Sequence, residues 1–111
     1  MNHGKQIRKF LKKKSPKTPL WNNCDNALVG TAQITRDNKL VTVAIYDYDL
    51  LVELFYNDYI NDAESQDDAQ TDAIEWVDYN IIGAYIGIRT PIYSKEDYLI
   101  GLDPKKTFLN P

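Results

Sequence analysis

The stretch from Tyr79 to Thr90 contains side chains that could recognise a polar or anionic ligand. The amide of Asn80 and the guanidinium of Arg89 can both donate hydrogen bonds, and a guanidinium pairs well with anionic oxygens. Tyr79, Tyr85 and Thr90 would complete one pocket with them. These five residues are the candidate ligand-binding set of the sequence.

The same residues also fit a structural role. Asn80 falls on the apolar arc of a predicted helix, beside Trp76 and Val77, and a buried amide left unpaired costs about 1–3 kcal/mol. Asn80 would then bond to backbone at the junction with residues 83–85. Arg89 could form an ordinary ion pair. Both interpretations stay open at this point.

No pattern in the sequence is typical of a catalytic or metal site. His3 lies in the N-terminal tail, and one histidine with one cysteine, Cys24, cannot complete a usual zinc site. The acidic segment 61–72 lacks the glycine and the ligand order of an EF-hand. The GAYIG run at 83–87 has neither the following helix nor the lysine of a phosphate loop. We therefore expect no enzyme, metal or cofactor, with a metal-dependent hydrolase as the enzymatic alternative.

The net charge of −3 conceals a strong division along the chain. Residues 18–111 carry six basic and sixteen acidic side chains, which gives a net charge of −10. Eleven of these acids lie between Lys39 and Arg89, and that segment contains no basic residue. The body should therefore repel phosphate. The tail should attract it, because residues 1–17 contain no acid and seven basic residues: Lys5, Arg8, Lys9, Lys12, Lys13, Lys14 and Lys17.

The sequence patterns of the segments that must position these residues predict a small α+β fold. The β-rich runs 27–35 and 40–46, joined by the polar turn 36–39, predict a hairpin whose Val41, Val43 and Ile45 face is covered by helices. Asp47 or Asp49 should cap a helix that runs to residue 59.

A second helix is predicted over 68–82, with Trp76 in the core and Gly83 ending it in a left-handed conformation. Replacing a core Trp76 by Ala would cost about 3–5 kcal/mol. A third strand is expected within 84–93, bent by Pro91, and a short strand or turn over 98–102 before a loose end.

Length and composition bound the organisation of the chain. With 111 residues and 43% hydrophobic side chains, we expect residues 1–20 as a basic arm lying across its own body, and 21–111 as one α+β domain. Neither a signal peptide nor a membrane-spanning run is evident, and a single cysteine suits a reducing compartment. These features predict a cytoplasmic protein without membrane contact, in which nucleic acid could bind only through the arm.

An open sheet edge and several exposed tyrosines predict a homo-oligomer, most simply a dimer.

Two segments carry a family resemblance: YDYDLLVELF at 46–55 and AIEWVDYNIIGAYIGIRTPIY at 73–93. Together they resemble a group of small, uncharacterised proteins encoded mainly by bacteriophages and prophages. Their shared elements are here Tyr46-Asp47-Tyr48 with Leu51, Glu75-Trp76 through Tyr79-Asn80, Gly83-Ala84-Tyr85 with Gly87, and Thr90-Pro91. The resemblance covers about half of the chain and implies origin and fold relatedness rather than an activity.

Three functions are compatible with these features. The first is a phage-type accessory protein, not an enzyme, that captures a host protein or a small polar or nucleotide-like ligand, plausibly against a defence system. The second is an acidic mimic of DNA that inhibits a nucleic-acid-binding host protein. The third is a structural, virion-associated interaction protein.

Overall fold

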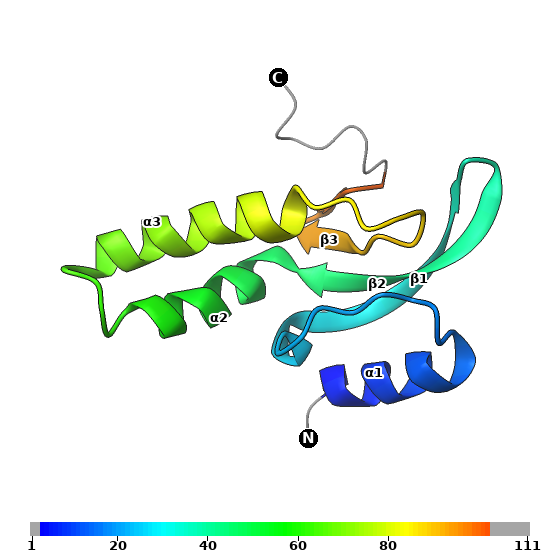
Figure 1. Cartoon of the computed structure of the whole chain (residues 1–111), viewed down its shortest axis with the longest axis horizontal. Helices are drawn as coiled ribbons and strands as arrows, with labels where there is room; N and C mark the ends of the chain where they lie inside the picture. The colour runs from blue at the N-terminus through cyan, green and yellow to red at the C-terminus, as the bar shows by residue number, and fades with distance from the viewer. Residues whose placement is uncertain (1–2, 103–111) are drawn as a thin grey trace.

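The computed structural model describes residues 3–102 as a four-stranded sheet with three α-helices (Figure 1). The α+β class expected from the sequence is confirmed. In chain order the elements are α1 (His3–Lys14), the 3₁₀ turn η1 (Asp25–Ala27), β1 (Leu28–Arg36), β2 (Lys39–Asp47), α2 (Tyr48–Tyr59), α3 (Gln66–Val77), the π-helical turn η2 (Asp78–Ile82), β3 (Ile92–Lys95) and β4 (Tyr98–Ile100).

The sheet has the strand order β1-β2-β3-β4. β1 and β2 form the expected antiparallel hairpin, turned by Asp37 and Asn38, whose positive φ angles of 50° and 63° suit a two-residue turn. β3 then pairs parallel with β2, and β4 pairs antiparallel with β3. β1 and β4 are therefore the edge strands, and the dimer expected at an open edge stays a prediction.

Both helices after the hairpin begin with a side-chain cap. The Asp47 carboxylate accepts from the Leu50 N–H at 2.8 Å, as expected, and the Ser65 hydroxyl accepts from the Asp68 N–H at 3.1 Å. The left-handed ending predicted at Gly83 is wrong, because its φ is −78°. The helix ends instead in the wider turn η2, where the Gly83 N–H bonds to the Asp78 carbonyl at 2.9 Å.

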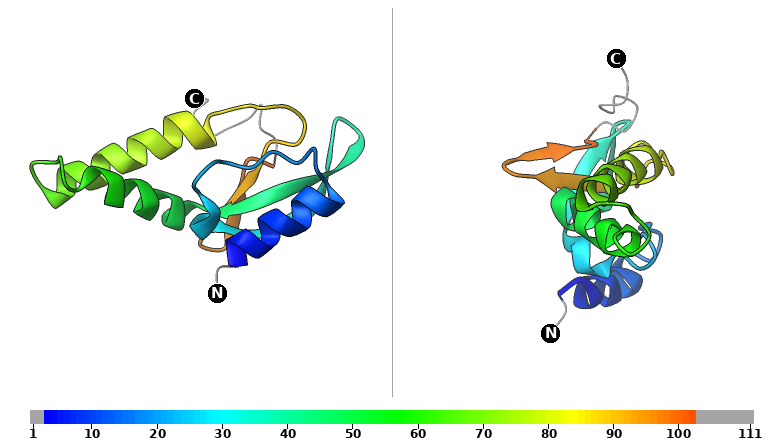
Figure 2. Two further views of the ribbon diagram at one scale, coloured as in Figure 1. Left: turned by 60° about the horizontal axis from the view of Figure 1, so that its bottom comes forward. Right: turned by 90° about the vertical axis from the view of Figure 1, so that its left-hand side faces the viewer.

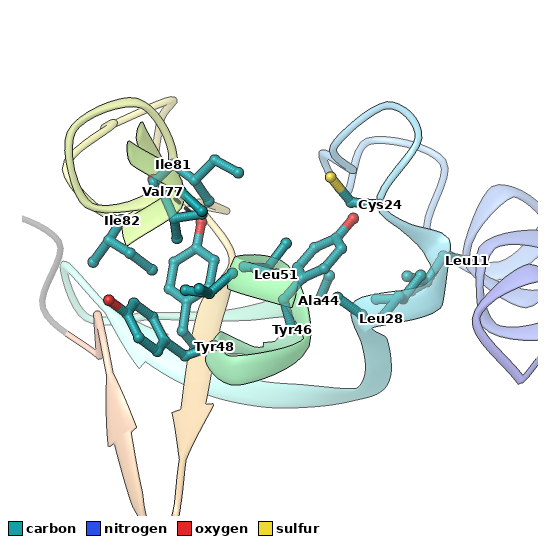
Figure 3. Close-up of a cluster of buried hydrophobic side chains, with 14 residues drawn as sticks. Leu11, Cys24, Leu28, Ala44, Tyr46, Tyr48, Leu51, Val77, Ile81 and Ile82 are labelled. Carbon is teal, nitrogen blue, oxygen red and sulfur yellow. Dashed lines mark hydrogen bonds between the residues drawn. The ribbon is translucent and has the colours of Figure 1, made fainter. Parts of the chain in front are cut away.

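The main core lies on the sheet face opposite to the one predicted. Ala44 and Tyr46 of β2 are fully buried in the cluster that α1, α2 and α3 cover, whereas Val41 and Val43 form a smaller cluster with Ile92 on the other face. Figure 3 shows Tyr46 between Leu51 of α2 and the loop that carries Cys24. Alternation alone was misleading because β2 carries apolar residues on both faces, and both are covered.

The predicted third strand begins too early. Residues 84–91 form a loop, and β3 starts only after Pro91. Gly87 has a φ of 108°, which side-chain-bearing residues rarely adopt, and the Thr90 N–H bonds back to the Gly87 carbonyl at 3.0 Å. This turn interrupts the alternation on which the prediction was based. The short strand expected near 98–102 is present as β4.

The loop 84–91 is held in place by Arg36, a charged side chain that is only 6% exposed. Its guanidinium donates to the carbonyls of Ile88 (2.9 Å) and Thr90 (2.6 Å) in the loop, and of Gly101 (2.7 Å) and Leu102 (3.2 Å) after β4. One side chain at the end of β1 therefore joins two segments more than fifty residues away in sequence.

The basic N-terminal segment folds as α1 against its own body. Leu11 is 1% exposed in the main core cluster, and Arg8 pairs with Asp25 at 2.8 Å. Ser15 and Thr18 share a hydrogen bond of 2.6 Å just after the helix. The residues expected as an arm therefore contribute to the core of the single fold.

Two positions on α3 and η2 differ from the predicted core. Trp76 is 37% exposed and stacks on Phe55 of α2, with ring centroids 4.3 Å apart, so its placement in the interior was wrong. Asn80 is exposed rather than on an apolar arc. The wider π turn advances each residue by a smaller angle, which keeps Ile81 in line with Val77 and turns Asn80 to solvent.

We predict that Arg36→Ala lowers the free energy of unfolding by about 3 kcal/mol or more, because it leaves one buried and three partly buried carbonyls without this donor. Urea denaturation followed by circular dichroism measures this. Arg89→Ala is the matched control, since Arg89 makes no hydrogen bond or ion pair among residues 3–102 and should cost less than about 1 kcal/mol. Equal losses in the two variants would contradict the role given to Arg36.

We predict a loss of about 2 kcal/mol for Trp76→Ala, below the value for a core tryptophan, because its indole is only partly buried. A double-mutant cycle with Phe55→Ala should give a coupling of about 1 kcal/mol from the stacked rings. Additive effects of the two substitutions would show that the stacking contributes nothing.

Candidate functional site

None of the five residues predicted to bind a ligand lines either of the two cavities described below. Tyr79 is 71% exposed and Tyr85 50% exposed, while Arg89 is half-buried. The exposed Asn80 amide donates to the Trp76 carbonyl one turn earlier at 3.1 Å. Thr90 is buried. The cavities described below are lined by other residues.

Thr90 has a structural role within its own loop. Its hydroxyl accepts from the Ile86 N–H at 3.0 Å and donates to the Gly87 carbonyl at 2.5 Å. Together with the Arg36 contacts, these bonds make the loop a fixed platform. On it Tyr85 and Ile86 stay exposed to solvent.

The helices α2 and α3 form a hairpin that extends away from the sheet (Figure 1). Its exposed acids, together with those of the connecting segment, are called here the acidic hairpin surface. Among residues 3–102 only one of these acids forms an ion pair, Asp49, with Lys95 at 3.2 Å. The nine members are Asp49, Glu53, Asp58, Asp62, Glu64, Asp67, Asp68, Asp72 and Glu75.

A cavity of about 300 Å³ opens at the base of this hairpin, where α2, η2, β3 and β4 meet. Tyr48 and Tyr98 supply aromatic surface, and Ile100 supplies aliphatic surface. The Tyr48 hydroxyl donates to the Asp78 carboxylate at 2.7 Å, and the Lys95 ammonium lies 4.7 Å from the centre of the Tyr48 ring. The Lys95 ammonium also pairs with the Asp49 carboxylate at 3.2 Å, so the cavity already contains a cation of the protein itself.

Sequence reasoning missed this cavity because its residues come from four separate elements. Lys95 and Tyr98 lie in a segment without a clear period, and Asp78 is one acid among many. The only available signal was the Tyr46-Asp47-Tyr48 element, which the family resemblance singles out.

Three tyrosines of the core have raised pKa values. Burial raises the pKa of Tyr46 to about 12, although the hydrogen bond from the Trp21 N–H at 2.9 Å opposes the shift. Burial also raises the pKa of Tyr93, whose hydroxyl accepts from the Trp21 indole at 2.9 Å. For Tyr48, burial and then the bond to Asp78 raise the pKa. These phenols are held as neutral hydrogen-bonding groups.

The Cys24 side chain is not suited to nucleophilic chemistry. It is 2% exposed, and burial followed by the nearby Asp25 charge raises the pKa of its thiol. The reactive form of cysteine is the thiolate, which both effects disfavour.

Residues 3–102 contain neither a metal-binding cluster nor a helix that could span a membrane. No three side chains among His, Cys, Asp and Glu come together there in a way that could hold a metal ion. Within the same range, every helix is too short or too polar to cross a lipid bilayer.

Comparison with protein-family models, curated proteins and solved structures finds no match to this chain.

We predict that stability falls as pH rises from about 10 towards 12. Free tyrosine loses its proton near pH 10, whereas folded Tyr46 keeps it to about pH 12, so the folded state binds more protons in this range. The measurement is urea denaturation at several pH values, with tyrosinate absorbance recorded in parallel. Tyr46→Phe should lower stability at neutral pH and flatten the alkaline decline. A wild-type stability that stays constant to pH 12 would contradict the prediction.

Proposed function

We propose that the protein is a non-enzymatic accessory protein that captures a cationic, nucleic-acid-binding host protein through its acidic hairpin surface. The observation that carries the proposal is the exposed acids of α2, α3 and their connecting segment. Except for Asp49, none of them forms an ion pair with a cation in residues 3–102. Uncompensated charge of one sign attracts a partner of the opposite sign and speeds association.

The spacing of these charges resembles that of a nucleic-acid strand. Asp68, Asp72 and Glu75 share one side of α3 and follow one another at about 6 and 4.5 Å along its axis, at 1.5 Å per residue. A DNA strand carries one phosphate for about every 3.4 Å of axis, a spacing of the same order. A protein surface made for phosphates could therefore accept this helix.

The cavity at the base of the hairpin supports the same proposal. Protein interfaces gain most of their affinity from a few buried aromatic or arginine anchors. Tyr48, Tyr98 and Ile100 offer an aromatic and aliphatic recess that suits one apolar side chain of the partner. Capture of a small polar ligand by the Asn80 set has less support, because Tyr79, Asn80 and Tyr85 are exposed and the Thr90 hydroxyl is bonded within its own loop.

The resemblance of residues 46–55 and 73–93 to phage and prophage proteins supports an accessory role in an infected cell, plausibly against a defence system. The proposal places the protein in the cytoplasm of the host, where a nucleic-acid-binding target is found.

The test is displacement of a fluorescent DNA duplex from a purified, sequence-independent DNA-binding protein. We expect the wild-type chain to release the duplex at 50 mM salt and to lose at least about tenfold in potency at 200 mM, because the contact is ionic. The triple variant Asp68→Asn, Asp72→Asn, Glu75→Gln should lose about tenfold at low salt.

The matched control removes three acids elsewhere. Asp37→Asn, Glu96→Gln and Asp97→Asn lie in two exposed turns outside α2 and α3, and this variant has the same net charge as the first. It should lose less than about twofold. Similar losses in both triple variants would mean that net charge, rather than the acidic hairpin surface, drives displacement.

A further inference from the structure

The outer face of α1 presents a row of exposed lysines. Leu11 anchors the helix to the core, and Lys9, Lys12 and Lys13 lie on the opposite side, exposed. None of these three forms an ion pair among residues 3–102. With Lys5 they repeat at intervals of four, three and one residues, which places all four on one side of a helix over about 12 Å.

A cavity of about 630 Å³ opens beside this lysine face. The Arg8 guanidinium donates to the Asp25 carboxylate and to the Trp21 carbonyl, both at 2.8 Å, and thereby ties the loop after α1 to the helix. The Asp25 charge is thus already compensated inside the cavity. Its lining combines cations with amides: Lys5, Arg8, Asn22, Asn23, Asp25 and Asn26.

We propose that the lysine face and this cavity together bind single-stranded nucleic acid. The lysines contact successive phosphates, which supply most of the affinity in such complexes. The amides of Asn22 and Asn23 carry both donors and acceptors, as the edge of a base does, and the cavity has the size of a small-ligand site. Only an unpaired base can present its Watson–Crick edge there, because base pairing already engages that edge in a duplex.

The acidic body does not cancel this attraction. Figures 1 and 2 show α1 and α3 on opposite sides of the molecule, which measures 46 × 39 × 24 Å. Charges in solvent are screened over about 10 Å at 0.1 M salt. The acids of α3 are therefore largely screened from a strand on the outer face of α1.

The test is fluorescence anisotropy with a labelled 12-nucleotide single-stranded DNA of mixed sequence, compared with its duplex. We expect the single strand to bind at least about fivefold tighter at 50 mM salt. Three phosphate contacts predict an affinity loss of about twentyfold between 50 and 200 mM salt. No binding at 50 mM salt, or equal binding of strand and duplex, overturns the proposal.

Two sets of variants assign the contacts. Lys9→Gln, Lys12→Gln and Lys13→Gln together should reduce binding at least tenfold and lower the salt slope by about two. The matched triple Lys39→Gln, Arg89→Gln and Lys95→Gln should reduce binding less than about threefold. Equal losses in the two triples overturn the assignment to α1.

The cavity is tested separately with Asn22→Ala and Asn23→Gly, the latter because Asn23 has a φ of 60° that glycine also adopts. The preference for single strand over duplex should fall towards one, with duplex binding unchanged. A deca-glutamate peptide is the competitor. If it displaces the strand as well as unlabelled strand does, the surface is a general anion site and the proposal is overturned.

Discussion

The buried guanidinium of Arg36 is the constraint on which the second half of the fold depends. A charged group out of water must be fully hydrogen-bonded, and here the partners are backbone carbonyls of the loop 84–91 and of the chain after β4. The loop, in turn, delivers the chain to β3, which pairs parallel with β2. Without that anchor, neither the position of β3 nor the addition of β4 to the sheet is secured.

A second polar network joins the first half of the chain to the same sheet. Trp21 donates to the hydroxyls of Tyr46 and Tyr93 through its backbone and its indole, and Tyr93 reaches the Ile81 carbonyl at 3.4 Å. These buried phenols sit on neighbouring strands, with ring centroids 6.3 Å apart. Fully satisfied networks of this kind favour one arrangement of the core over others. They explain why the segment after α1 packs against the sheet instead of remaining a separate arm.

The fold then separates charge in space. α1 carries its lysines beside the β1–β2 hairpin, and α2 and α3 carry the acids of residues 49–75 on a helical hairpin that extends away from the sheet (Figures 1 and 2). Folding could have cancelled this division of charge if the basic N-terminal segment had packed against the acids of α2 and α3. Instead Arg8 pairs with Asp25 of η1, and Lys9, Lys12 and Lys13 form no ion pair among residues 3–102. The two ends therefore remain available to partners of opposite charge, which is the common basis of both proposed interactions.

Local patterns in the sequence were sufficient for the elements whose signals are local. The hairpin turn at Asp37-Asn38, the cap at Asp47 and the buried row Ala69, Ala73 and Val77 of α3 follow from residue type and spacing alone. The charge division was equally evident. Such features depend on neighbours a few residues apart, so the sequence contains their whole cause.

Only the tertiary structure determined three other features: which face of β2 is the main core face, the exposure of Asn80 and Trp76, and the loop before β3. β2 is apolar on both sides, so the packing of three helices chose the Ala44–Tyr46 face. The π turn η2 places Asn80 towards solvent, and Trp76 stacks on Phe55 of the neighbouring helix α2. Arg36 stood in what reads as a polar turn, yet its bonds reach residues 88–102. Contacts between distant segments leave no pattern in the local sequence, because they depend on residues that only the folded chain brings together.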